Sequence, residues 1–246
     1  MDEPAGSADA HGIRFQALVA TSGRRSTVSG CTREQFMGRI RSALGRGDDP
    51  VAPCPELEEA LVRRPESDGD LADRFAARAV DVGMFVHWVG AGELHAAIIK
   101  VLKEHEARTV VIGMKDGRAM RESLESGSVE IVEWRDHPGF EIQYDVDASV
   151  TDVHAAFAET GTVVCCSDAD HSRGLSLVPP LHVAVVRRED ILPDVLDFWN
   201  RMPRDADLPS SIAFITGPSK TADIEGVLVT GVHGPREVHV MLVGAD

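Results

Sequence analysis

The sequence predicts an α/β protein with a largely parallel, doubly wound sheet in a single domain. Short runs rich in β-branched residues alternate along the chain with longer segments that repeat apolar residues at helical spacing. Hydrophobic residues make up 43% of the 246 residues, whereas aromatic residues make up only 5%. A core of this composition must consist mainly of Val, Ile, Leu and Ala, which is typical of buried parallel sheets.

The N-terminal part of the chain differs from the rest. Its first residues lack sustained periodicity and mix Gly, Ser, Ala and Arg. Thr32 and Gln35 then form the pattern of a capping box at the start of a helix. A linker with three prolines separates this helix from a short one near 56–63. We therefore expect a mobile tail (1–30), a helical segment (31–66) and an α/β core (67–246).

The core alternates helices and strands. Its first half predicts a helix from Leu71 that ends at Gly83, a strand at 84–89, a helix at 92–105, a strand at 109–113, a helix near 118–126 and a strand at 129–134. Its second half predicts a helix at 152–158, strands at 162–166 and 182–186, a helix near 189–200, and strands at 211–215 and 237–243. This alternation is typical of parallel strands joined by helical crossovers.

The charge of the chain excludes some classes of partner. The formal net charge is −15, and binding to nucleic acid or to an anionic membrane requires clustered Lys and Arg. No apolar run approaches the roughly 18 residues that cross a bilayer. The acidic N-terminus lacks the basic region of a secretory signal. We expect a cytoplasmic protein without nucleic-acid binding or membrane insertion.

The segment from Ile215 to Val240 gives the strongest indication of a site, because connections this rich in glycine and charge usually line one. Its first turn follows a predicted strand and is expected to open a helical turn at Thr221. Free backbone N–H groups and the charge of Lys220 would then bind a carboxylate or phosphate. A capped turn with a solvated lysine is the alternative. The candidate ligand-binding residues are Thr216, Gly217, Pro218, Ser219, Lys220 and Thr221.

The same segment contains the acid–base candidates. Asp223 is a candidate ligand-binding residue and Glu225 a candidate catalytic one, because a carboxylate beside an anion site can act as base, nucleophile or hydrogen-bond acceptor. Stabilisation of a helix dipole is the alternative. His233 is the second catalytic candidate. Gly231 and Gly234, also candidate ligand-binding residues, would hold its imidazole in a fixed direction, and a turn-stabilising hydrogen bond is the alternative.

Two further segments are candidates for ligand binding. The turn formed by Thr160, Gly161 and Thr162 is expected to join a helix to a strand and to approach the same pocket. Arg173 could bind an acid through two parallel hydrogen bonds. Each has a structural alternative, a glycine-terminated helix in the first case and a surface arginine in the second.

Histidine and cysteine positions predict no metal site. His239 alternates with valines on a predicted strand and is expected to be structural, whereas His182, at the start of a strand, could be structural or functional. The other histidines considered lack the His-x₃-His spacing of zinc sites: His87, His95, His105, His137, His154 and His171. The four cysteines lack a C-x-x-C pair and are expected to be reduced and structural.

Four segments resemble a known family. TGPSKTADIE (216–225) and GVHGPREVHV (231–240) resemble the signature of the LUD domain of bacterial lactate-utilization proteins. AETGTVV (158–164) and SLVPPLHVAVV (176–186) match the same family in the expected order. The resemblance covers roughly residues 31–244. The chain is similar to the short, single-domain C-type members, because it lacks the cysteine-rich iron–sulfur segment of the B-type members.

The resemblance implies a fold and a function. The fold would belong to the sugar-phosphate isomerase and CoA-transferase (NagB/RpiA/CoA-transferase-like) superfold, and the function would be a role in the oxidation of L-lactate to pyruvate. Oxidation needs a cofactor that accepts electrons, yet the chain has no G-x-G-x-x-G after a strand, no cluster-binding cysteine set and no covalent haem motif. We therefore expect no cofactor in this chain and iron–sulfur lactate-utilization proteins as partners.

Other classes of function remain open on the residues alone. The polar segment and the implied superfold also suit a stand-alone enzyme or a binding protein for an anionic metabolite, such as a sugar phosphate or an acyl-CoA. A purely structural adaptor is a third possibility. Whether the chain is itself an enzyme is left open at this point.

Overall fold

The chain divides into two compact units, Met1–Glu58 and Glu59–Asp246. The computed structural model describes residues 31–45, 58, 69–115, 117–125, 129–136, 141–202, 208–221 and 229–244. The predicted tail (1–30) and the short helix near 56–63, except Glu58, lie outside the described residues. The expected domain limits therefore stay predictions.

The described part of the first unit is helix α1 (Arg33–Ala43), preceded by the predicted capping box. The hydroxyl of Thr32 accepts a hydrogen bond from the backbone N–H of Gln35, and the side-chain oxygen of Gln35 accepts one from the backbone N–H of Thr32. Two backbone N–H groups at the start of the helix are thus satisfied, which explains why the helix begins here.

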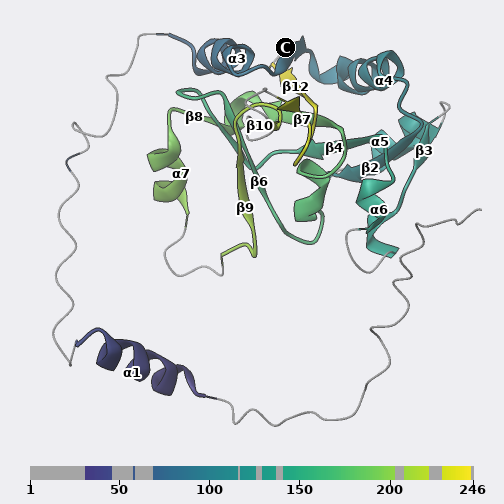
Figure 1. Cartoon of the computed structure of the whole chain (residues 1–246). Helices are drawn as coiled ribbons and strands as arrows, with labels where there is room; N and C mark the ends of the chain where they lie inside the picture. Colours follow the sequence, from purple (N-terminus) through teal and green to yellow (C-terminus); the bar gives the residue numbers. More distant parts are fainter. Residues whose placement is uncertain are drawn as a thin grey trace, which may run out of the picture. The chain divides into compact units, whose positions relative to one another are not determined.

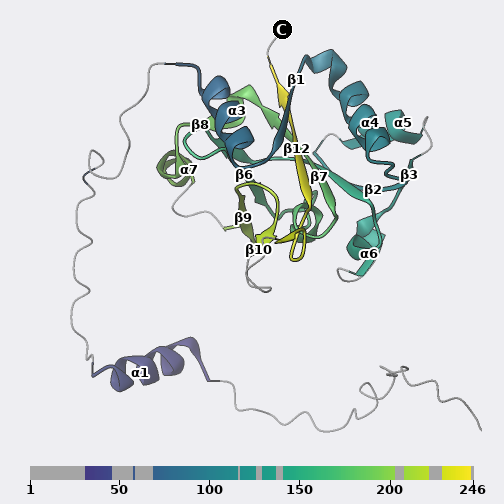
Figure 2. The ribbon, with the colours of Figure 1, turned by 45° about the horizontal axis from the view of Figure 1, so that its top comes forward.

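The second unit is built on a six-stranded sheet, in which all neighbouring strands are parallel (Figures 1 and 2). The strands follow the order β1-β12-β7-β4-β2-β3, so the last strand of the chain lies between β1 and β7. Their bounds are β1 Phe85–Val89, β2 Thr109–Gly113, β3 Glu130–Ile131, β4 Ala148–Asp152, β7 Leu181–Arg187 and β12 Glu237–Val243.

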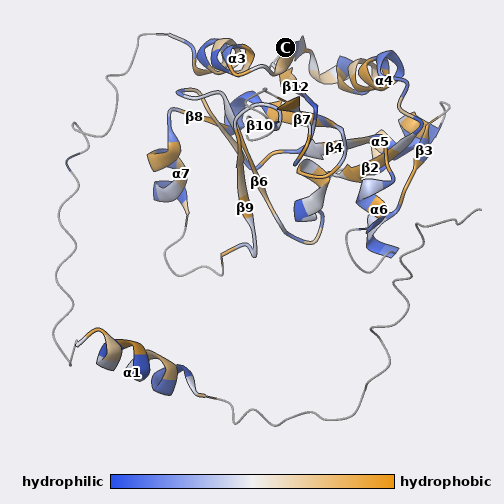
Figure 3. Ribbon diagram, viewed as in Figure 1, coloured by the Kyte–Doolittle hydropathy of each residue, from blue (hydrophilic) through white to orange (hydrophobic). Residues whose placement is uncertain are grey.

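Helices cover both faces of this sheet, as a doubly wound fold requires. Apolar side chains of α4 (Leu94–Glu104) and α5 (Gly117–Glu125) pack with Val110, Val150 and Val183 on one face. Helix α3 (Leu71–Asp81) packs with Val186 and Val240 on the other. In Figure 3, α3 and α4 carry both apolar and polar colours, as expected of helices with one buried side.

A second, four-stranded sheet of order β8-β5-β6-β9 adds a layer on the α3 side. One side of it shares a hydrophobic core with α3 and β7, and its other side packs against α7. Its strands are β5 (Ala155–Phe157), β6 (Thr162–Cys166), β8 (Ile191–Leu192) and β9 (Ile212–Ile215), and α7 spans Val195–Arg201.

The remaining elements are short. A two-stranded antiparallel ribbon pairs β10 (Lys220–Thr221) with β11 (Val229–Thr230). The others are α6 (Glu141–Tyr144) and the 3-10 turns η1 (Ala91–Glu93), η2 (Trp134–Asp136), η3 (Arg173–Ser176) and η4 (Arg188–Asp190). None of the helices in the described part of the chain is long and apolar enough to cross a membrane.

The predicted α/β class and parallel sheet are confirmed, and most predicted elements are present. Gly83 adopts a φ of +94° directly after the C-cap of α3 and before β1. A left-handed glycine there ends the helix, as the sequence predicts.

One predicted element is wrong and two are shorter than predicted. The helix predicted at 152–158 is the end of β4 followed by β5, because Val153 and His154 donate backbone hydrogen bonds to Val185 and Val164 on neighbouring strands. Strand pairing thus overrides the helical propensity of its alanines. The helix predicted near 189–200 begins only at Val195, after η4 and β8, and the strand predicted at 129–134 is reduced to β3.

Gly161 should tolerate no side chain. Its φ is +67°, and an added Cβ would collide with the backbone of Arg78 and Ala79 in α3. We expect Gly161→Ala to lower the free energy of unfolding by about 1–3 kcal/mol, measured by urea denaturation. Gly92→Ala is the matched control, because a Cβ added to Gly92 would meet nothing within 4 Å, and it should change stability by less than about 0.5 kcal/mol. Equal effects would contradict this packing.

Candidate functional site

A cavity of about 560 Å³, here called the amino-end cavity, lies beside the loops that precede β4, β7 and β12. These strands are parallel and adjacent, with Leu181 paired to both Ala148 and Glu237. The loops that lead into them therefore meet at one edge of the sheet. The lining residues are Tyr144, Arg173, Leu177, Val178, Gly231, Val232, His233 and Gly234.

The amino-end cavity combines a cation, two hydrogen-bonding groups and an apolar wall. Arg173 supplies a guanidinium, His233 an imidazole and Tyr144 a phenol, whereas the wall consists of two valines and a leucine. A guanidinium binds a carboxylate through two parallel hydrogen bonds, and an apolar wall accommodates a short carbon chain. The cavity therefore suits a small organic acid.

The sequence predicts four of the eight lining residues: Arg173, Gly231, His233 and Gly234. Backbone hydrogen bonds explain how their loop is held. The N–H of Gly231 donates to the carbonyl of Ser219 at 2.8 Å, and the N–H of Ser219 donates to the carbonyl of Pro235 at 2.9 Å. The two glycine-rich turns of the segment thus lie side by side, and Ser219 supports the loop that carries His233.

The other predicted residues form a second group, which packs against the end of α3. The hydroxyl of Thr162 lies 2.6 Å from that of Thr160 and 2.8 Å from that of Thr216. Gly217 has a φ of +95° and passes so close to the carbonyl of Val82 that a Cβ would collide with it. The turn at 160–162 joins β5 to β6, not a helix to a strand as predicted.

Lys220 contacts the end of α3 and is not among the residues that line the amino-end cavity. Its Nζ donates to the carbonyl of Val82, the C-cap of α3, at 3.4 Å. A lysine near the C-terminus of a helix satisfies a free carbonyl and interacts favourably with the helix dipole. The expected helical turn at Thr221 is wrong, because Lys220 and Thr221 form β10, whose partner strand is β11. Pro218 lies in the turn before β10, and Asp223 and Glu225 lie outside the described residues.

A charged cluster at the opposite edge of the sheet was not predicted. Asp152, the last residue of β4, and Asp168 both contact the ring of His171, which is buried. The Nδ1 of His171 lies 2.7 Å from Asp168, and its Nε2 is bonded to Asp152. The sequence places Asp152 in a predicted helix at 152–158 and therefore does not indicate a site there. Its true position, at the carboxyl end of a parallel strand, is one where functional residues are expected.

The electrostatics of this Asp152–His171–Asp168 cluster favour its charged form. Burial disfavours the imidazolium, but hydrogen bonds to Asp152 and Asp168 outweigh it and raise the pKa of His171. Burial likewise opposes the charge of Asp152, yet the hydrogen bond to His171 lowers the pKa of that carboxyl. The cluster fastens the segment after β6 to the end of β4. Arg173 follows His171 by two residues, so the cluster also sets where Arg173 begins its approach to the cavity.

A smaller hollow of about 200 Å³ lies at the same edge as this cluster and is lined by Lys115, Arg118, Arg121 and Arg135 among others. Its three arginines are paired with Glu122, Glu133 and Asp170 respectively. Its volume is well below that of the amino-end cavity. The segments that resemble the LUD family also favour the amino-end cavity over this hollow. Residues 176–186 and 231–240 supply six of the eight residues that line the larger cavity.

Comparisons with known proteins show the family of the chain. The LUD domain family matches residues 72–243. Lactate utilization protein C of Halalkalibacterium halodurans is 30% identical over 82% of this chain and 94% of its own length. The protein of the same name from Deinococcus radiodurans is 31% identical over 83% and 91%. The uncharacterized protein YkgG of Escherichia coli K12 is 31% identical over 86% and 97%.

One solved structure shows the same fold. The crystal structure of a DUF162 family protein from Deinococcus radiodurans superposes with a TM-score of 0.52 at 24% sequence identity. It covers 73% of this chain and all of that one. The likeness supports the α/β fold described above, including its parallel sheet.

The Asp152–His171–Asp168 cluster predicts a pH-dependent contribution to stability. His171→Gln leaves two carboxylates without their cation and should cost about 3–5 kcal/mol at pH 6. The pKa of His171 is higher in the folded protein than in the unfolded one. The wild type therefore has this stabilisation in full below the pKa of His171 in the unfolded state, and loses it as the pH rises through the pKa of His171 in the folded state. The difference between variant and wild type, measured by urea denaturation, should therefore be smaller at pH 9 than at pH 6.

His95→Gln is the matched control, because it removes a partly buried histidine that contacts only Ser123 among the hydrogen bonds described. It should cost little at either pH. If the cost of His171→Gln were the same at pH 6 and pH 9, the cluster would not contain a charged imidazole.

Proposed function

Because the chain belongs to the LUD domain family, we propose that it acts in lactate utilization by binding L-lactate or pyruvate in the amino-end cavity. It works there with iron–sulfur partner subunits. Several relatives carry the name Lactate utilization protein C. We also propose a cytoplasmic location, because the described cysteines are free, as is usual in a reducing compartment.

The observation that carries the proposal is the composition of the amino-end cavity. Its guanidinium, imidazole and phenol surround a space bounded by Leu177 and Val178. In the proposed complex, Arg173 binds the carboxylate of a 2-hydroxy or 2-oxo acid through two hydrogen bonds. His233 contacts the hydroxyl or keto oxygen, and the methyl group lies on the apolar wall.

The proposed division of labour follows from the balance of the reaction. Conversion of L-lactate to pyruvate releases two electrons and two protons, one proton from the hydroxyl and one from the adjacent carbon. An imidazole can accept a proton near neutral pH, so His233 takes the hydroxyl proton in this proposal. The two electrons and the proton of the adjacent carbon require acceptors beyond His233, and the proposal assigns them to the iron–sulfur partner subunits.

Loss of Arg173 should weaken acid binding. A charge-assisted hydrogen-bonded contact contributes about 1.5–3 kcal/mol, so Arg173→Gln should lower the affinity for L-lactate or pyruvate by roughly one to two decades. Isothermal titration calorimetry with the purified chain measures this. Arg118→Gln is the matched control, because Arg118 is an exposed arginine on α5 outside the amino-end cavity, and its affinity should equal that of the wild type.

Lys220→Ala separates this cavity from the anion site that the sequence predicts around Lys220. Binding in the cavity should be unaffected, because Lys220 contacts the end of α3. Loss of affinity in Lys220→Ala but not in Arg173→Gln would refute the proposed site. The same titrations with a sugar phosphate and with CoA test the alternative function, and binding of either in place of lactate and pyruvate would favour it.

The partnership makes a separate prediction. When it is co-expressed with the iron–sulfur lactate-utilization proteins, the chain should co-purify with them through size-exclusion chromatography. The Arg173→Gln variant should assemble with them equally well, because the proposal assigns Arg173 to substrate binding. Reduction of the clusters by L-lactate should then fall in the variant. Separate elution of wild-type chain and partners at micromolar concentration would contradict the partnership.

A further inference from the structure

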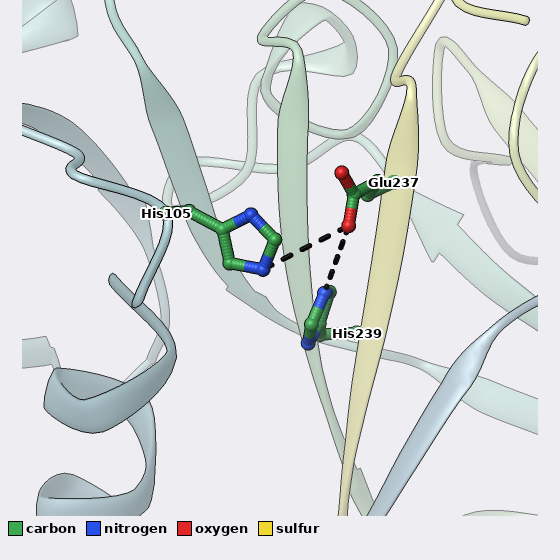
Figure 4. A group of neighbouring side chains, drawn as sticks. All are labelled: His105, Glu237 and His239. Carbon is green, nitrogen blue, oxygen red and sulfur yellow. Dashed lines mark ion pairs between the residues drawn. The ribbon is translucent and has the colours of Figure 1, made fainter. Parts of the chain in front are cut away.

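Side chains from two distant parts of the sequence meet on the α4 side of the sheet, His105 from one part and Glu237 and His239 from the other (Figure 4). Glu237 and His239 alternate along β12 and therefore point to the same face. His105 directly follows α4, which packs against β12. Figure 4 shows the two imidazoles and the carboxylate pointing toward one another. We call these three residues the His–Glu cluster.

The spacing of the His–Glu cluster suits a small cation. The Oε2 of Glu237 lies 3.5 Å from the Nε2 of His239 and 3.7 Å from the Nε2 of His105. One possible ligand atom from each of the three residues lies within 4.8 Å of the other two. Ligands about 2.1 Å from a tetrahedral zinc ion are about 3.3–3.4 Å apart. Small movements, mainly of the exposed His105, would complete that geometry.

The hydrogen bonding of His239 supplies independent support. Its Nδ1 lies 3.0 Å from the Nε2 of His87, so these two nitrogens share one hydrogen. Its Nε2 is buried and makes no hydrogen bond, although the carboxylate of Glu237 is nearby. If His239 donates from Nδ1 to His87, its Nε2 lone pair faces a negative charge. A cation between the two removes this repulsion.

The surroundings of His239 agree with a ligand role. The bond to His87 acts as the supporting contact that orients a metal-binding histidine, and Phe85 stacks on the same ring with 4.7 Å between centroids.

We propose that His105, Glu237 and His239 bind a divalent transition-metal ion, with Zn²⁺ the ion that this donor set suits best. Two imidazoles and one carboxylate form a familiar zinc ligand set that leaves a fourth position open. The side chains of His105 and Glu237 are 29% and 41% exposed, so that position faces solvent. A water molecule or a small anion completes the coordination.

The cluster of His154, Asp168 and His171 is the other arrangement of this kind among the described residues, but none of its ring nitrogens offers a free lone pair. The backbone N–H of Cys166 donates to Nδ1 of His154, so the ring hydrogen is on Nε2 and points to Asp168. Both nitrogens of His171 contact carboxylates. Each ring nitrogen is thus occupied in a hydrogen bond, whereas Nε2 of His239 is not.

The test is zinc binding by the full chain, prepared without a polyhistidine tag and stripped with a chelator. We expect one equivalent of Zn²⁺ per chain by calorimetry, a rise in thermal midpoint on adding Zn²⁺, and visible absorption bands of a tetrahedral ion when Co²⁺ replaces it. His105→Ala and Glu237→Gln should each weaken Zn²⁺ binding by about tenfold or more. Both residues are partly exposed, so the variants should fold.

Two histidine variants serve as matched controls. His95→Ala removes a histidine at the other end of α4, and His154→Ala removes one from the second cluster; both should keep wild-type affinity for Zn²⁺. Absence of saturable binding in the wild type would overturn the proposal, as would equal affinity in His105→Ala and Glu237→Gln. If His154→Ala lost Zn²⁺ binding while His105→Ala kept it, the ion would bind at the second cluster, and this result would also overturn the proposal.

Discussion

The insertion of β12 between β1 and β7 is the constraint on which the rest of the second unit depends. Seven residues of β12 pair with β7 and five pair with β1. Val238, Val240 and Leu242 are fully buried on one face and Met241 on the other. Without this C-terminal strand, β1 would have no neighbour in the sheet. The same pairing fixes the loop before β12, which lines the amino-end cavity, and the two β12 residues of the His–Glu cluster.

A second constraint is the irregular segment between β6 and β7, which crosses one face of the sheet with little regular structure. Polar contacts along its length hold it. Asp152 binds His171 at one end, and the amide of Gln143 donates to the hydroxyl of Ser172 at 3.3 Å further along. Beneath it, His182 is fully buried and lies 2.9 Å from the hydroxyl of Thr151. Burial lowers the pKa of His182 to about 4, so this ring stays neutral beside Thr151.

The sequence predicts the fold better than it predicts the site. Apolar runs such as residues 109–113 match their strands, because burial on both faces leaves a continuous β-branched pattern. The run at 152–158 misleads, since its alanines favour a helix locally and only pairing with β6 and β7 makes it extended. Arg173 and His233 are predicted individually, yet their common cavity depends on two strands beginning at one edge. The His–Glu cluster could not be predicted from spacing, because His105 and His239 are brought together by topology alone.

The location of the amino-end cavity and of the His–Glu cluster departs from the usual rule for open α/β sheets, in which ligands bind at the carboxyl ends of the strands. The structure offers a physical reason. At the carboxyl end of β4, Asp152 is engaged by His171 and by the backbone N–H of Lys115. Arg121 and Arg135 beside it are paired with carboxylates. Displacing such contacts costs a ligand much of its binding energy. At the amino end, the glycine-containing loop before β12 borders the cavity instead, and Arg173, His233 and Tyr144 line it.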